Sequence, residues 1–165
     1  MAKGASKKPD PSGVVLVASN RAARHNFHID DTYECGIVLR GSEVKSLRES
    51  KVQLSDAFGQ LSGGELYLHH LHIAPYSMSQ RHSGHDPMRV RKLLLHRHEL
   101  DRMSAKVQRE RLTIVPLRLY FKDGKAKVEV GLGKGKRSVD KRQDIAARDA
   151  AREAAREAGR MAKYG

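Results

Sequence analysis

Residues 112–133 read LTIVPLRLYFKDGKAKVEVGLG, and this stretch decides the predicted fold. Two apolar runs flank the pair Asp123-Gly124, which is a strong signal for a tight β-hairpin. One face of the first run carries four apolar side chains: Ile114, Leu117, Leu119 and Phe121. Pro116 interrupts that run, and it predicts either an edge strand or a bulge at this point.

Similar patterns extend outward from this hairpin toward the N-terminus. Residues 57–73, AFGQLSGGELYLHHLHI, predict a second hairpin with SGG at 62–64 as its turn. Alternating apolar residues predict strand over 25–39. A short helix is expected at 41–48 with Ser42 as its N-cap. Another helix is expected after a strand ending at Leu95, with His96 as N-cap and Glu99 in capping-box position.

The predicted elements are about six short strands, two short helices and two tails. Antiparallel strands flanked by short helices favour a mainly β fold, an OB-like closed barrel. We expect a flexible N-terminal segment at 1–13, the barrel at 14–133 and a basic C-terminal tail at 134–165.

The tail, KGKRSVDKRQDIAARDAAREAAREAGRMAKYG, contains eight Ala, ten Lys or Arg and five Asp or Glu. Ala and Arg favour helix, but the few large apolar residues form no continuous stripe. A helix without an apolar face lacks the tertiary packing that normally stabilises it. The tail is therefore expected to be disordered alone and to become helical on an anionic partner.

The chain has 165 residues, a formal net charge of +13 and a pI of about 10.1. Nucleic acid is the leading partner for such a chain, and an anionic membrane comes second. The membrane is disfavoured because the tail offers Ala where a peripheral helix needs bulky apolar residues. The longest apolar run, at 14–18, is far too short to span a bilayer. The first thirteen residues do not form a secretory signal, and a single cysteine fits a reducing cytosol, so a cytoplasmic protein is expected.

No set of residues typical of an enzyme stands out. Cys35 is either a nucleophile or, in the favoured interpretation, a small core residue. The nine histidines lack the cysteine pairs of a structural zinc site and are better explained as solvated or RNA-facing, so we expect no metal or other cofactor. The run GLGKGKRS at 131–138 fails the phosphate-loop pattern and is interpreted as a flexible hinge before the tail.

Glu34 is a carboxylate between Tyr33 and Cys35 in a basic chain. It is either a solvated strand residue that pairs with a nearby lysine or an acceptor of hydrogen bonds from a base edge such as that of guanine. The spacing alone slightly favours the first interpretation.

Three motifs follow one another along the chain: EVKSLR at 43–48, RKLLLH at 91–96 and GKxxxDKR at 135–142. In these motifs and their order, the chain closely resembles the SmpB family of SsrA-binding proteins. The resemblance extends from Asn20 to Arg142 nearly without gaps and continues loosely to the end. His28 departs from the usual aromatic residue, Cys35 from the more common Ala, and Arg137 from Lys.

This resemblance implies an OB-like barrel that is not an enzyme. It implies binding to the tRNA-like domain of transfer-messenger RNA (tmRNA, or SsrA RNA) and delivery of alanyl-tmRNA to stalled ribosomes in bacterial trans-translation. The tail would enter the empty mRNA channel near the small-subunit decoding centre. Alanyl-tRNA synthetase and elongation factor Tu would be indirect partners through the RNA. The alternative is a general OB-fold RNA chaperone or ribosome-associated RNA-binding protein.

Two sets of site residues follow from the same resemblance. The tmRNA-binding set is Asn20, Arg21, His25, Tyr33, Glu34, Gly36, Lys92, Leu93, Leu94 and Lys127. The ribosome-binding set is Gly135, Lys136, Arg137, Asp140, Lys141, Arg142 and Met161.

Overall fold

The computed structural model describes residues 11–77 and 84–164, and it divides into two units, residues 1–134 and 135–165. The expected flexible segment at 1–13 lies mostly outside the described residues. The elements of the first unit, which extend to Gly135, are β1 (Val14–Ser19), α1 (Arg21–Asn26), β2 (Phe27–Ile37), α2 (Gly41–Arg48), β3 (Val52–Gln53), β4 (Phe58–Ser62), β5 (Glu65–His69), β6 (His72–Ile73), β7 (Arg91–Leu94), α3 (Arg97–Glu110), β8 (Thr113–Lys122) and β9 (Lys125–Gly135).

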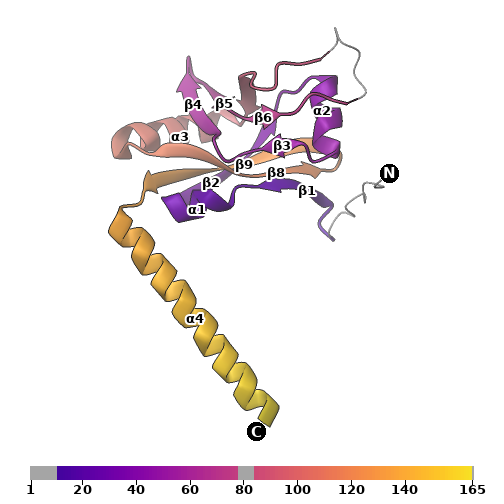
Figure 1. The fold of residues 1–165 in the computed structure, drawn as a ribbon. Coiled ribbons are helices and arrows are strands. Elements are labelled where there is room, and N and C mark those ends of the chain that lie inside the picture. The colour runs from indigo at the N-terminus through magenta and orange to yellow at the C-terminus, as the bar shows by residue number, and fades with distance from the viewer. Residues whose placement is uncertain (1–10, 78–83, 165) are drawn as a thin grey trace. The chain divides into compact units, whose positions relative to one another are not determined.

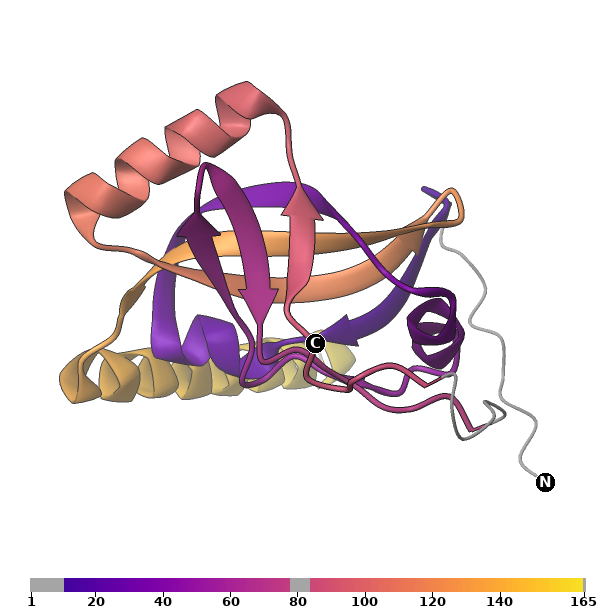
Figure 2. The ribbon, with the colours of Figure 1, turned by 90° about the horizontal axis from the view of Figure 1, so that it is seen from above.

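Six strands form a closed ring in the order β8-β4-β5-β7-β2-β9, because β9 also pairs with β8. The strand β1 joins β8, and β3 and β6 form a separate two-stranded ladder. Seen from above, the strands curl around a common centre, and α2 and α3 lie on opposite sides of them (Figure 1, Figure 2). The prediction of a mainly β barrel with flanking helices is confirmed.

The predicted hairpin at 112–133 is formed by β8 and β9. Asp123 and Gly124 both have positive φ, 50° and 77°, as the preferred two-residue hairpin turn requires. The register shifts between Pro116 and Arg118, so the bulge alternative for Pro116 is correct. The edge-strand alternative is wrong, because β8 has neighbours on both sides.

The bulge also corrects the predicted face of β8. Ile114, Leu119 and Phe121 belong to the main core, but Leu117 belongs to a second cluster with Ala23 and Val115. The extra residue changes which side chains point inward, because alternation restarts after a bulge.

Asn20 fills a gap along one side of β8. β4 pairs with β8 at Ile114, and β1 pairs with β8 only from Arg118 onward. Between these two pairings, the Asn20 backbone N–H donates to the Leu117 carbonyl at 2.8 Å, and its side-chain amide donates to the Pro116 carbonyl at 3.1 Å. Backbone acceptors that no strand reaches are thereby satisfied.

The core inside the ring is built from alternate residues of the strands. Among its fully buried members are Leu66, Leu68, Leu71, Ile73, Leu119 and Leu132. The first four are the apolar residues expected from the second hairpin. β4 and β5 form this hairpin with a turn at 63–64, because Ser62, predicted in the turn, pairs with Glu65.

Two helices match their predicted positions. In α3 the His96 N–H donates to the Glu99 side chain at 3.3 Å, as the capping-box prediction requires. In α2 the N-cap is Arg40 rather than Ser42, because the Glu43 carboxylate reaches back to the Arg40 N–H at 2.9 Å. The hydroxyl of Ser42 hydrogen-bonds to His85 instead.

Two expectations about flexible or extended segments are wrong. Residues 21–26 form α1, so the strand begins at Phe27 rather than at His25. The proposed hinge at 131–138 is mostly part of β9, which ends at Gly135. A Cβ atom on Gly131 would lie 2.8 Å from Ile29, and one on Gly133 would lie 2.8 Å from Phe27. These glycines are required for close packing rather than for bending.

The second unit contains one helix, α4 (Ser138–Tyr164), so the helix that the Ala and Arg content favours is present. None of the residues of α4 is buried. At its start, the Arg137 N–H donates to the Asp140 carboxylate at 3.2 Å, which satisfies one of the free donors of the first turn.

Candidate nucleic-acid interface

Glu34 on β2 and Tyr120 on β8 meet on the outside of the barrel. The Tyr120 hydroxyl donates to Glu34 Oε2 at 2.5 Å, and Lys122 Nζ lies 3.4 Å from Glu34 Oε1. The hydrogen bond from Tyr120 and the charges of Lys122 and Lys127 outweigh partial burial and lower the pKa of Glu34. The carboxylate is therefore ionised at neutral pH and keeps free acceptor sites.

Basic and aromatic groups surround this carboxylate. Lys127 lies opposite Tyr120 in the β8–β9 ladder. The Arg118 guanidinium lies 5.3 Å from the centre of the Tyr120 ring and forms an ion pair of 2.6 Å with Glu129. A charged acceptor among cations suits a ligand that offers both phosphates and hydrogen-bond donors, as folded RNA does.

Gly36 continues the face of β2 that carries Glu34, and Leu94 of β7 lies beside it. Glu34 and Gly36 are two residues apart, so they point to the same side of the strand. Gly36 pairs with Leu94 of β7, and a Cβ atom on Gly36 would lie 3.3 Å from Leu94 Cβ. Lys92 also belongs to β7, and its ammonium lies 3.7 Å from a Glu65 carboxylate oxygen.

One predicted tmRNA contact, Leu93, has its side chain directed into the core, and a second, Tyr33, is only partly exposed. The side chain of Leu93 is fully buried in the core, so it is removed from the candidate interface. It alternates with Lys92 and Leu94, and alternate residues face opposite sides of a strand. Tyr33 is partly buried and packs against the same core.

Cys35, which lies between Glu34 and Gly36 in the sequence, is a core residue. Its side chain is fully buried, and burial raises the pKa of its thiol to about 12. A protonated thiol without solvent access is not a nucleophile, which favours the core interpretation over the reactive one.

The remaining predicted contacts of the barrel lie in α1 and at its N-cap. The Asn20 side chain reaches the carbonyls of Pro116 and Leu54, so it has a structural role whatever else it binds. Arg21 is exposed and His25 is partly exposed. Asn20 also borders a surface hollow of about 210 Å³ between α1 and the start of β4.

The predicted ribosome contacts lie at the end of β9 and in the second unit. Lys136 forms an ion pair with Asp144, and Asp140 accepts the Arg137 N–H described above. Lys141 and Arg142 belong to the first turns of α4, and Met161 near its end is 79% exposed.

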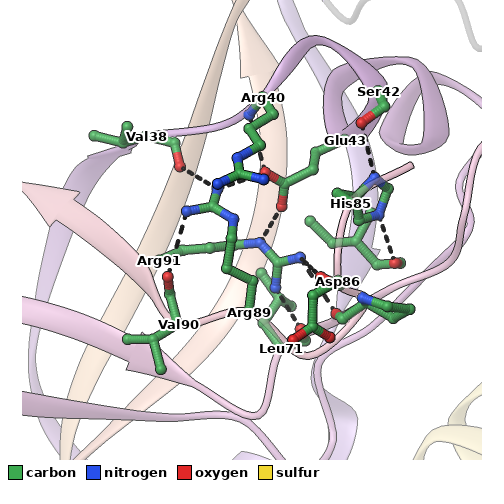
Figure 3. A network of polar contacts seen from close by, with 12 residues as sticks. Val38, Arg40, Ser42, Glu43, Leu71, His85, Asp86, Arg89, Val90 and Arg91 are labelled. Atoms are coloured by element: carbon green, nitrogen blue, oxygen red, sulfur yellow. Dashed lines mark hydrogen bonds and ion pairs between the residues drawn. The ribbon is translucent and has the colours of Figure 1, made fainter. Parts of the chain in front are cut away.

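A buried ionic network lies beside β7 (Figure 3). The Arg91 side chain donates to the Glu43 carboxylate, and both side chains are fully buried. Arg91 also donates to the Leu71 carbonyl at 2.6 Å. Burial alone would raise the pKa of Glu43, but hydrogen bonds from the Arg40 N–H, Arg89 and Arg91 lower it.

Within residues 11–77 and 84–164, no three His, Cys, Asp or Glu side chains are placed to hold a metal ion. His82, one of the histidines weighed in the sequence, lies outside these ranges. No helix in the same part of the chain is long and apolar enough to cross a membrane.

The profile of the SmpB protein family matches residues 17–160. The chain belongs to the SmpB family. An SsrA-binding protein of Salinispora tropica is 56% identical over 142 residues, covering 86% of this chain and 89% of the relative. The SsrA-binding protein of Mycolicibacterium smegmatis is 53% identical over 158 residues, covering 96% and 98%.

A solved structure of the SmpB family has a similar fold. It is described as "tmRNA-SmpB: a journey to the center of the bacterial ribosome", and it is 47% identical with a TM-score of 0.62. The match covers 81% of this chain and 94% of that chain. Membership of the SmpB family thus rests on sequence and structure together.

Two residues that contact Glu34, Tyr120 and Lys122, are absent from the sequence-predicted set, and so is Arg118, which contacts Tyr120. The sequence contained enough information to find Tyr120. A two-residue turn at Asp123-Gly124 places Tyr120 opposite Lys127, which the family resemblance had already selected.

Proposed function

We propose that this chain binds the tRNA-like domain of tmRNA and delivers alanyl-tmRNA to stalled ribosomes. The observation that carries the proposal is the ionised Glu34, held by Tyr120 among lysines on one face of a barrel of the SmpB family. The relatives are named for binding SsrA RNA, and the similar solved structure concerns tmRNA and the ribosome.

In this proposal the Glu34 carboxylate accepts hydrogen bonds from a base edge, and nearby cations contact phosphates. The proposed contacts on the barrel are Asn20, Arg21, His25, Tyr33, Glu34, Gly36, Lys92, Leu94 and Lys127. The binding is non-enzymatic, takes place in the cytoplasm, and involves alanyl-tRNA synthetase and elongation factor Tu only through the RNA.

We propose further that the second unit contacts the small ribosomal subunit. Its proposed contacts are Gly135, Lys136, Arg137, Asp140, Lys141, Arg142 and Met161. Because α4 has no buried residues and is rich in charged side chains, we infer that a groove of ribosomal RNA supplies its packing. The mRNA channel near the decoding centre, when it is vacant, would be such a groove. Bound mRNA would compete with α4 for this channel.

The Glu34→Gln variant tests the proposed interface. Gln keeps an oxygen that can accept from Tyr120 but loses the carboxylate. Removing an acidic charge from a basic chain should strengthen non-specific RNA binding. A loss of about tenfold in affinity for the tRNA-like domain, measured by gel shift, would therefore identify a specific hydrogen bond. Glu110→Ala, which also removes an exposed acid, is the control and should not weaken binding.

The alternative, a general RNA chaperone, is favoured by the basic charge spread over both units. Competition distinguishes the two functions. An unrelated structured RNA of equal length should displace the tRNA-like domain only at much higher concentration. Equal competition, together with unchanged binding by Glu34→Gln, would contradict the tmRNA-specific proposal.

A further inference from the structure

Three branched apolar side chains lie at one end of the proposed interface. Val38 follows the last residue of β2, and its N–H donates to the Lys92 carbonyl at 3.0 Å. Val90 precedes the first residue of β7. Because side chains alternate along a strand, Val38 continues the face of Glu34 and Gly36, and Val90 continues the face of Leu94.

These side chains are open to solvent. Val38 is 44% exposed, Val90 45% and Leu94 50%, although each is a large apolar residue. An exposed apolar group of this kind beside charged residues is typical of an interaction surface.

Arg89 holds the two valine backbones in place. One of its terminal nitrogens lies 3.5 Å from the Val90 carbonyl, and the other lies 3.4 Å from the Val38 carbonyl. The second nitrogen also donates to the Glu43 carboxylate at 2.5 Å. In Figure 3 both valine side chains point to the same side, away from the guanidinium of Arg89.

The anchor of this arrangement is buried. Glu43 is fully buried and is also bonded to Arg91 and to the Arg40 N–H. The planar guanidinium of Arg89 can join three oxygens at fixed angles, which the ammonium of a lysine cannot do. The network therefore fixes where Val38 and Val90 lie beyond the ends of their strands.

We propose that Val38, Val90 and Leu94 form an apolar patch that covers a nucleobase exposed in a loop of the bound RNA. Arg89 is a positioning residue for this patch. The inference rests on the proposed function and adds Val38, Val90 and Arg89 to its interface. RNA is the occupant because the patch continues the face that carries Glu34 and Lys92, and because looped-out bases present apolar faces that proteins cover with apolar side chains.

The double variant Val38→Thr/Val90→Thr tests the patch. Threonine keeps the branched shape and the strand preference but places hydroxyls where apolar contact is expected. Affinity for the tRNA-like domain should fall roughly tenfold. The dependence of affinity on salt should stay unchanged, since no phosphate contact is removed. Val139→Thr makes the same change at an exposed valine of α4 and should bind like the wild type.

The test of the apolar patch can fail without contradicting the proposed function. If Glu34→Gln weakens binding and the double variant binds like Val139→Thr, the patch is wrong and the function stands. If neither variant weakens binding, both proposals are overturned. Urea unfolding checks that the double variant is folded, and the two single valine variants give the same measurement if it is not.

Arg89→Lys tests the positioning role. The variant keeps the positive charge but cannot join the two valine carbonyls and Glu43 together. We expect weaker RNA binding that is non-additive with Val38→Thr/Val90→Thr, because Arg89 acts through the valines. Additive losses would overturn the positioning role, and so would unchanged binding by the folded Arg89→Lys variant.

Discussion

Glu34 and Glu43 are two carboxylates whose pKa values are both lowered, but for different purposes. Glu34 lies on the surface with free acceptor sites, and its partners are Tyr120 and lysines. Glu43 is buried, and guanidinium groups and a backbone N–H occupy its oxygens. The first carboxylate is available to a ligand, whereas the second is committed to the fold.

Removing Glu43 should strongly destabilise the protein. The Glu43→Ala variant leaves the buried Arg91 charge without its partner, which costs about 3–5 kcal/mol in the free energy of unfolding. Urea denaturation measures this value. Glu49→Ala removes an exposed glutamate that pairs with Lys51 and should cost less than about 1 kcal/mol. Equal effects of the two variants would show that the network contributes no stability.

The lowered pKa of Glu34 predicts a pH-dependent contribution to stability. A carboxyl whose pKa is lower in the folded state stabilises that state fully above its ordinary value of 4.5. This contribution is lost as the pH falls through the lower, folded value. The difference in unfolding free energy between the wild type and Glu34→Gln should therefore be largest above pH 5 and shrink in acid. A difference that is constant from pH 7 to pH 3 would contradict this assignment.

At the scale of elements, the glycines of β9 show how a sequence pattern can mislead. A run in which every second residue is glycine suggests flexibility, yet Gly131 and Gly133 lie in a strand against Phe27 and Ile29. Their missing side chains make room for those of β2. The pattern does not contain this information, because the contacting residues are about a hundred positions away.

Gly133→Ala should destabilise the barrel. Its Cβ would lie 2.8 Å from Phe27 Cβ and 2.9 Å from Ile29 Cδ1, and such overpacking costs about 1–3 kcal/mol. Gly135→Ala is the matched control, since no atom lies within 4 Å of its added Cβ. The control should be neutral or slightly stabilising in thermal unfolding. A control that is destabilised equally would indicate a backbone effect instead of a packing effect.

The two hairpins and the cap of α3 were predictable because their signals are local. A two-residue turn fixes the pairing of both strands, and a capping box spans four residues. The helix α1 was missed because residues 21–26 carry no apolar stripe, and Ala23 alone packs against Val115 and Leu117. The Glu43–Arg91 network was also missed, since 48 residues separate its two members.

At the scale of the whole molecule, the candidate site combines predictable and unpredictable parts. Glu34, Gly36 and Leu94 followed from the family motifs, and the structure pairs Gly36 with Leu94. Leu93 was wrongly included because a motif specifies neighbours in sequence but not the side of the strand that each one faces. Lys122 was not predictable, because its contact with Glu34 joins β8 to β2 across β9, which lies between them in the ring.

The division into two units predicts that the barrel works without the tail. A chain ending at Lys134 should bind the tRNA-like domain with nearly normal affinity, because the proposed RNA contacts on the barrel precede that residue. It should fail to support peptide tagging on stalled ribosomes in a reconstituted translation reaction. An equal loss of RNA affinity and tagging in the truncated chain would contradict the two-unit scheme.

Cys35 has a practical consequence for following the barrel itself. It is the only cysteine of the chain, it is fully buried, and its pKa is raised to about 12. An alkylating reagent attacks only a thiolate that it can reach, so the native protein is labelled only while the ring is open. The rate of labelling therefore counts openings of the barrel. Cys35 is therefore a built-in probe of barrel opening, and bound RNA should lower the rate at which it is alkylated.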